Sequence, residues 1–92
     1  MAGPRYIADP PELVRSAELE SLTAIFHRPS GMTHLLAPPA PQILAVLAEK
    51  PADAFEVLAR IAGDFELEAE DPEAAIAARL DELEAAGLVR RV

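Results

Sequence analysis

Two segments of strand-forming residues flank a four-residue turn in the first half of the chain. The turn is Arg28-Pro29-Ser30-Gly31, in which proline fixes φ at the second position and glycine readily takes a left-handed conformation. The segments on either side, 22–27 and 32–36, are therefore predicted to form an antiparallel hairpin. This hairpin constrains the fold most strongly, because most of the chain after it is predicted to be helical.

The loop length sets the register of this hairpin. A three-residue loop closed by a G1 bulge would place Arg28 opposite Met32 and Thr33 opposite His27. Because side chains alternate along a strand, this register predicts two faces of different character. The more apolar face is expected to carry Leu22, Ala24, Phe26, Met32, His34 and Leu36. The other face is expected to carry Thr23, Ile25, His27, Thr33 and Leu35.

The N-terminal dozen residues contain three prolines, which interrupt both helices and central strands. We expect residues 1–12 to form an extended or loosely ordered segment, with Tyr6–Ile7 as an anchor. Residues 13–19 are a predicted further strand. Residues 13–92 are expected to form one domain, because a chain of 92 residues has room for a single modest core.

Three helices are predicted after the strands. Pro41 suits the first turn of a helix, because its missing N–H needs no partner there. Asp53 and Glu56, three residues apart, form a predicted capping box for a second helix. Asp71 is the predicted cap of a third helix, which opens with a proline and ends at Gly87.

Apolar residues recur at helical spacing in these segments, which predicts the faces that pack in the core. In the second helix the expected buried residues are Phe55, Leu58, Ile61 and Ala62. In the acidic connector of residues 64–70, Phe65 and Leu67 are expected to point inward. The side chains expected to hold the frame are Phe26, Leu36, Ile43, Leu47, Leu58, Ile76, Leu80 and Leu83. Leu88–Val89 are expected to return to the core as an extended tail.

Charge and cysteine content exclude several classes of function. The net charge is −8, and residues 49–86 hold twelve acids against three basic residues. Because lysine and arginine supply most of the affinity for duplex DNA, nucleic acid is not an expected partner. The absence of cysteine excludes disulfides and thiolate zinc sites. No apolar run approaches the ~20 residues of a membrane span, so we expect a soluble, cytoplasmic protein without membrane contact.

No catalytic, cofactor or metal site is predicted. In the predicted register His27 and His34 point to opposite faces, and the chain has no third histidine to complete a metal site. Nucleophilic catalysis by Ser30 or Thr33 would need a base oriented by an acid, and no acid stands at a recognisable spacing. Enzyme activity is therefore not expected.

The strand after Gly31 is the expected binding element. A strand at the edge of a sheet presents unpaired backbone groups, to which an extended peptide can add. If the third helix packs near this strand, its flank forms the opposite wall of a channel. The expected peptide-binding residues are Met32, Thr33, His34, Leu35, Leu36, Ala77, Asp81 and Glu84. The plainer alternative is an edge covered by a loop.

The hairpin run from Phe26 to Leu36 and the ending from Leu80 to Val89 carry a family likeness, which extends over residues 13–92. The chain resembles the PqqD family of peptide chaperones. More narrowly, it resembles the branch associated with an HPr-kinase-related kinase, whose hairpin has the same Phe-His-Arg-Pro-Ser-Gly-x-Thr-His-Leu-Leu run. The hairpin run is fairly specific, whereas the leucine-rich ending is shared by many winged-helix domains.

The resemblance implies an α+β fold of the winged helix-turn-helix type, with two or three antiparallel strands before three helices. It also implies a protein without catalysis of its own, a recognition element that delivers a precursor peptide to a modifying enzyme. The leader peptide would add as a strand to Met32–Leu36 and lie against the helix of residues 73–86. The implied partners of this branch are the kinase and a nucleotidyltransferase-like protein.

Other hypotheses stay open. The hairpin would instead dock the kinase if the domain were a regulatory or scaffolding subunit, and a free strand edge would also pair two copies into a homodimer. A DNA-binding winged helix is less favoured, because a recognition helix should carry basic or amide residues toward the bases. The second and third helices offer only Arg60 and Arg79 among many acids.

Overall fold

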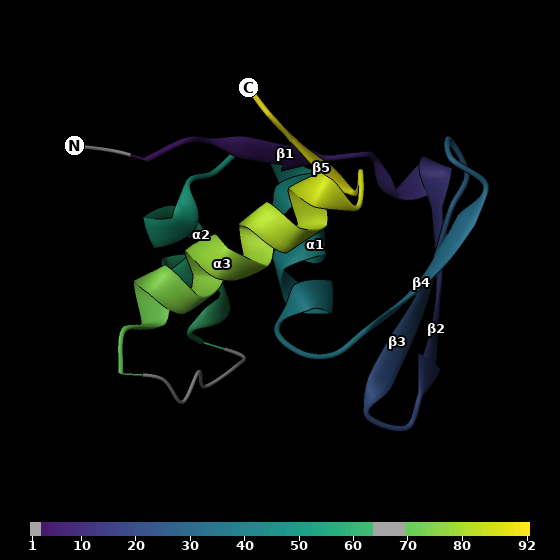
Figure 1. Ribbon diagram of the computed structural model, residues 1–92, viewed down its shortest axis with the longest axis horizontal. Coiled ribbons are helices and arrows are strands. Elements are labelled where there is room, and N and C mark those ends of the chain that lie inside the picture. Colours follow the sequence, from purple (N-terminus) through teal and green to yellow (C-terminus); the bar gives the residue numbers. More distant parts are fainter. Residues whose placement is uncertain (1–2, 64–69) are drawn as a thin grey trace.

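The computed structural model describes residues 3–63 and 70–92. Within them the chain is α+β, with antiparallel strands followed by three helices (Figure 1). The main sheet contains β2 (Val14–Leu19), β3 (Leu22–His27) and β4 (Met32–Leu36), in the order β2-β3-β4. A short 3-10 helix, η1 (Pro11–Leu13), precedes β2. The predicted fold class and the boundaries of the hairpin strands are thus confirmed.

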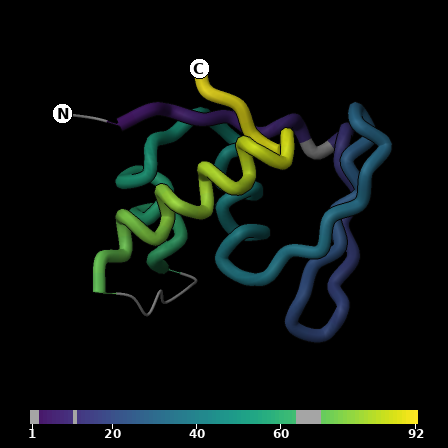
Figure 2. The backbone as a smooth tube through the Cα atoms, in the orientation of Figure 1, coloured from purple at the N-terminus to yellow at the C-terminus, as the bar shows by residue number. Residues whose placement is uncertain are grey.

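A second sheet of two strands joins the two ends of the chain. β1 (Tyr6–Ala8) pairs antiparallel with β5 (Val89–Arg91), and the two run side by side at the top of Figure 2. Tyr6 is 3% exposed, and its backbone exchanges hydrogen bonds with Ala52 (2.8 and 3.0 Å). Residues 6–8 are thus extended and their backbone is paired, and Tyr6, which was expected to anchor the segment, fills the core.

Three helices pack around the core beside the main sheet. They are α1 (Ala40–Glu49), α2 (Ala54–Ile61) and α3 (Pro72–Ala85). In Figure 1 α3 crosses in front of α1, and the main sheet stands to one side of the helices. The helical residues that are at most 3% exposed are Ile43, Leu47, Val57, Ile61, Ile76, Leu80 and Leu83. Among the described residues, no helix combines the length and the apolar character needed to cross a bilayer.

The predicted helix caps are confirmed. The Asp53 side chain accepts a hydrogen bond from the Glu56 N–H (2.8 Å), and the Glu56 carboxylate accepts one from the Asp53 N–H (3.1 Å). Asp71 caps α3 by accepting from the Ala74 N–H (3.1 Å). Gly87 follows α3 with a φ of +80°, a left-handed conformation that favours glycine. These local contacts fix where α2 begins and where α3 begins and ends.

Some side chains predicted to be in the core lie at the surface. Phe55 is 65% exposed and Ala62 is also exposed, because Val57 and Ile61 form the buried stripe of α2. Phe26 of β3 is 39% exposed. The predictions for Phe65 and Leu67 fall outside the described residues. The other expected frame residues are buried or packed against the core.

The register of the β3–β4 hairpin differs from the predicted register by one residue. Met32 lies opposite His27, and Thr33 lies opposite Phe26. The cause is the loop, which has four residues between the paired strands instead of three. Gly31, with a φ of +69°, closes it by donating its N–H to the His27 carbonyl (2.9 Å).

The shifted register exchanges the faces that the strands present. A slip of one residue moves every side chain of one strand to the opposite face relative to its partner. Ile25 and His27 consequently point into the protein together with His34 and Leu36 of β4, and each of the two β3 side chains is 5% exposed. Phe26 lies on the outer face because its neighbours on β3 point inward.

The single tyrosine offers a test of how firmly β1 is attached. Burial raises the pKa of the Tyr6 phenol from its ordinary value of 10.0, although the nearby Arg91 guanidinium opposes the shift. Since the folded protein holds this proton more tightly, the contribution to stability is complete below pH ~10 and is lost as the pH rises toward the folded-state pKa. The chain has no tryptophan, so phenolate absorbance reports Tyr6 alone.

We expect the absorbance midpoint of the folded protein to lie above 10 and to return to about 10 in concentrated urea. Tyr6→Phe should abolish the signal, which serves as the control. A midpoint that is the same with and without urea would contradict the burial of Tyr6 between β5 and the helices.

Candidate functional site

β2 and β4 are the edge strands of the main sheet, because each pairs with β3 on one side only. The hydrogen-bonding pattern decides which of their backbone groups are free. The Arg28 N–H donates to the Leu13 carbonyl (2.9 Å), and this pair continues the register in which Val14 lies opposite His27. Hydrogen-bonded and non-hydrogen-bonded pairs alternate along an antiparallel ladder. Because the Arg28–Leu13 pair is hydrogen-bonded, the next pair, His27–Val14, is not, and neither is Ile25–Ser16. His27 and Ile25 therefore turn their N–H and C=O groups away from β2 and toward β4.

The same alternation fixes the free groups of β4. Met32 and His34 lie opposite His27 and Ile25, so their backbone groups bond to β3. Thr33 and Leu35 turn their N–H and C=O groups to the open edge. An extended chain can therefore add to β4 through hydrogen bonds at these two residues.

The five residues predicted on β4 stand together along this edge. Leu35 is 61% exposed on the outer face, and Met32 is 57% exposed at the rim of the inner face. His34 and Leu36 are half-buried, and Leu36 packs against the core. The His34 Nε2 atom is buried and has no hydrogen-bond partner among the described residues. The edge thus combines free backbone groups, apolar side chains and one polar nitrogen without a partner.

The predicted wall on α3 lies elsewhere. Asp81 and Glu84 face β5, where Arg91 Nη2 is 3.9 Å from Asp81 Oδ1 and Arg91 Nε is 3.2 Å from Glu84 Oε2. Ala77 and Asp81 line a cavity of about 360 Å³ together with Tyr6 and Arg91. Ala77, Asp81 and Glu84 were predicted to form the wall on the assumption that their flank of α3 packs near β4. The strands β1 and β5, of which the second was expected to be a simple tail, occupy that side instead.

A polar cluster around the buried His27 ties the hairpin to the rest of the protein. His27 Nε2 lies 2.6 Å from Asp9 Oδ2, and His27 Nδ1 lies 2.9 Å from Ser30 Oγ. Arg90 Nη1 of β5 is 3.4 Å from Asp9 Oδ1. The cluster therefore connects the hairpin turn, the segment after β1 and the C-terminal strand.

Asp9, which was not predicted from the sequence, is the acid that orients His27. The order serine, histidine and aspartate resembles a catalytic triad. However, the Ser30 hydroxyl also accepts a hydrogen bond from the Met32 N–H (3.3 Å), which engages it in closing its own turn. Asp9 lies eighteen residues from His27, so no sequence spacing signals their contact.

The prediction that His27 and His34 point to opposite faces of the sheet is wrong. In the observed register His27 and His34 lie on the same face of the sheet, two residues apart along the pairing. His27 directs both ring nitrogens to Asp9 and Ser30. Over residues 3–63 and 70–92, no three histidine or acidic side chains are grouped as metal ligands.

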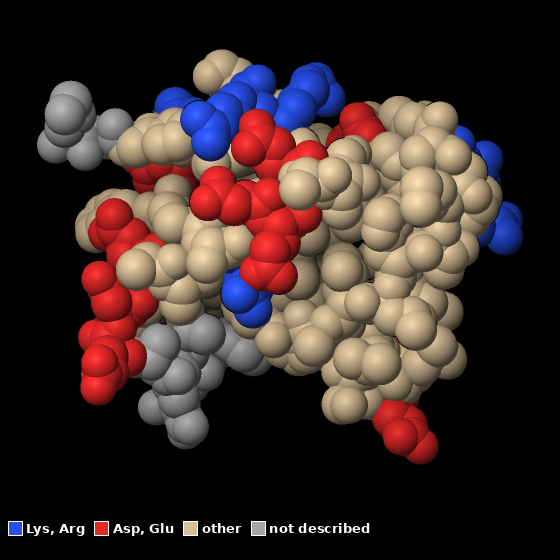
Figure 3. All heavy atoms as spheres, viewed as in Figure 1, with Lys and Arg blue, Asp and Glu red and all other residues tan. Residues whose placement is uncertain are grey.

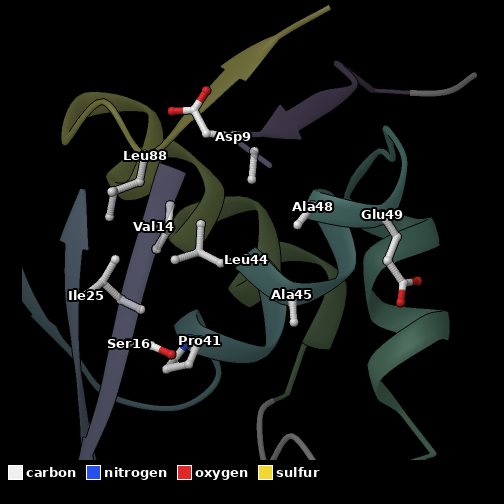
Figure 4. Close-up of a pocket in the computed structure, with 11 residues that line it drawn as sticks. Asp9, Val14, Ser16, Ile25, Pro41, Leu44, Ala45, Ala48, Glu49 and Leu88 are labelled. Carbon is white, nitrogen blue, oxygen red and sulfur yellow. The ribbon is translucent and has the colours of Figure 1, made fainter. Parts of the chain in front are cut away.

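A cavity of about 350 Å³ lies beside the other edge strand, β2, between the inner face of the sheet and α1 (Figure 4). Val14, Ile25 and Leu44 supply apolar walls. On the α1 side the lining includes Ala45 and Ala48, whose small side chains leave the space open. Alanines three residues apart, among the larger apolar residues of α1, are the sequence signal that would have indicated this cavity.

The outer face of the main sheet is apolar and exposed. Its large side chains include Leu19, Leu22, Phe26 and Leu35, all of which are exposed. In Figure 3 the surface over the sheet carries few charged side chains, whereas acidic side chains gather over α3. Exposed apolar surface of this kind is typical of sites that bind other proteins.

The fold is shared with solved structures of peptide complexes, although no family model matches the sequence and no curated protein is significantly similar to it. One such structure is TbiB1 in complex with the TbiA(beta) leader peptide, with a TM-score of 0.62 and 18% identity over 89% of this chain and 94% of that chain. Another is lasso peptide synthetase B1 complexed with the leader peptide, with a TM-score of 0.62 and 21% identity over 92% of this chain and 96% of that chain. These likenesses show the fold of the chain.

The polar cluster predicts the effect of removing Asp9. Asp9→Ala should destabilise the protein by about 1–3 kcal/mol, because it leaves the His27 Nε2 atom buried without a partner. Arg90→Ala is the matched control, since it removes only the ion pair of an exposed guanidinium and should change the free energy of unfolding by less than about 1 kcal/mol. Urea unfolding measures both. Equal effects of the two substitutions would contradict a structural role for the Asp9–His27 contact.

Proposed function

We propose that the chain is a non-catalytic adaptor that binds the leader segment of a precursor peptide and presents it to a modifying enzyme. The leader would add as a strand to β4 along Met32–Leu36. The observation that carries this proposal is the open edge of β4, where Thr33 and Leu35 turn their backbone groups outward. The likeness to two structures that hold a leader peptide supports it.

The side chains of the edge indicate the kind of peptide that fits. A strand added to β4 would place alternate residues beside Leu35 on the outer face and beside Met32 and Leu36 on the inner face. Apolar residues at these positions would extend both faces of the sheet.

The hairpin run supports a finer assignment to the PqqD family of peptide chaperones, in the branch associated with an HPr-kinase-related kinase. The partners of the adaptor would then be that kinase and a nucleotidyltransferase-like protein. Duplex DNA has no place in this proposal, because α3 carries an acidic surface.

A role without catalysis accounts for the cluster around His27. The imidazole is buried, and the Ser30 hydroxyl is held by the backbone of its own turn. Ser30 lines neither of the two cavities described above. A nucleophile needs a substrate site beside it, so the cluster suits attachment of the hairpin better than chemistry.

The exposed outer face favours a second candidate function, in which the domain is a regulatory or scaffolding subunit of the kinase. Leu19, Leu22 and Phe26 would then form the contact surface. Co-purification of the two proteins in the absence of a leader peptide would favour this role. A third use of an open edge is homodimer formation by strand pairing, which sedimentation velocity would detect as a doubled mass.

Proline substitutions test the edge of β4. Leu35→Pro and Thr33→Pro each remove an outward N–H without removing a hydrogen bond between β3 and β4. The probe is a candidate leader peptide from a precursor encoded near the gene of this chain. We expect each substitution to weaken binding of this peptide by about tenfold, the equivalent of one lost hydrogen bond of ~1.4 kcal/mol. Isothermal titration calorimetry measures the affinity.

Leu35→Ala and Thr33→Ala are the matched controls, because they shorten the side chains and keep the N–H groups. They should weaken binding less than the proline variants do. Unchanged affinity with proline at either position would refute strand addition at β4.

A further inference from the structure

We propose that the cleft between β2 and α1 is a second strand-addition site, which takes an extended protein segment that carries lysine or arginine two residues away from an apolar residue. This site lies on the edge of the main sheet opposite to β4. It therefore goes beyond leader binding and would let the domain hold two chains at once. Free backbone groups, an apolar cavity and nearby acidic side chains meet at this cleft.

The backbone of β2 is open along the cleft. Hydrogen-bonded and non-hydrogen-bonded pairs alternate along β2 from the Arg28–Leu13 hydrogen bond, so Arg15 and Ala17 direct their backbone groups to β3. Ser16 and Glu18 consequently turn their N–H and C=O groups to the open edge. Ser16 also lines the cavity, so the free backbone and the cavity belong to one continuous surface.

The cavity suits an apolar side chain of an added strand. Its volume of about 350 Å³ is in the range of ligand sites, and Val14, Ile25 and Leu44 line it from three different elements. A strand beside β2 would project alternate side chains toward the inner face of the sheet. One such side chain would stand over the cavity and against Ala48 of α1 (Figure 4).

Two exposed acidic residues beside the cleft favour a basic segment. Glu49 of α1 lines the cavity (Figure 4), whereas Asp9, which also lines it, is already paired with His27 and Arg90. Glu18 is exposed on β2 and points to the same inner face as Ser16. A lysine or arginine two residues from the apolar residue would point to this same inner face, because side chains alternate along a strand, and would meet Glu18 or Glu49. A second copy of the chain fits poorly, because each copy has a net charge of −8 and would bring its own Glu18 to the contact.

The test uses the full chain with isotope labels and two capped six-residue peptides. One peptide has isoleucine at position 3, lysine at positions 1 and 5 and threonine elsewhere, and the other has glutamate in place of each lysine. In an NMR titration we expect the lysine peptide to shift the amide signals of residues 14–18 and 41–49 and to bind at least ~10-fold more tightly than the glutamate peptide. Equal binding of the two peptides, or shifts confined to β4, would overturn the proposal.

Cavity-filling variants make the test specific. Ala48→Phe should weaken binding of the lysine peptide by about tenfold, because the ring occupies the cavity. Ala59→Phe, at an exposed position of α2, is the matched control and should leave binding unchanged. If Ala48→Phe does not fold, Ser16→Pro provides a second variant, because it removes an outward N–H at the same edge. Full binding of the lysine peptide by a folded Ala48→Phe or Ser16→Pro variant would overturn the proposal.

The two edges can be separated experimentally. Leu35→Pro on β4 should leave the lysine peptide bound with unchanged affinity. Ser16→Pro on β2 should leave leader binding unchanged. If the unmodified chain binds the lysine peptide but not the leader peptide, only the function proposed for β4 is contradicted. If it binds the leader peptide but not the lysine peptide, only the site proposed at β2 is contradicted.

Discussion

The pairing of β3 with β4, in which His27 lies opposite Met32, governs most of what the rest of the structure can do. It directs Ile25 and His27 into the protein and leaves Phe26 outside. It also determines that Thr33 and Leu35 present their backbone to the open edge. A shift of β4 by one residue would turn Thr33 and Leu35 toward β3 and reverse the faces of the β4 side chains, because side-chain direction and hydrogen-bonding direction both alternate along a strand. The four-residue loop is therefore as important for the proposed binding surface as the strands themselves.

Much of the fold follows from short-range chemistry that is visible in the sequence. Asp53, Asp71 and Gly87 mark helix ends because a cap acts within three or four residues of the backbone group that it satisfies. The stripe of Ile76, Leu80 and Leu83 is predictable for a similar reason, since helical spacing alone brings these residues to one face. The location of β4 as an edge strand could also be predicted from the order of the elements.

The rest depends on contacts between distant segments. The turn sequence suits a loop of three or four residues, so only packing of the sheet against the helices selects between them. Nothing near Asp9 indicates that it meets His27, and nothing near Glu84 indicates that Arg91 will occupy that flank of α3. Phe55 shows the converse case, because a large apolar residue at helical spacing remains outside when Val57 and Ile61 already fill the space.

The pairing of β1 with β5 has a consequence for how this domain can be combined with others. Tyr6 and Arg91 are direct partners across the small sheet, so the backbone enters and leaves the fold about 5 Å apart. Domains with neighbouring entry and exit points can be placed within a loop of a host protein without forcing its ends apart. Such an insertion would also restrain the hairpin, because Asp9 follows β1 directly and holds His27. Mechanical tension on the two ends would accordingly reach the main sheet through the Asp9–His27 contact as well as along the backbone from β1 to β2.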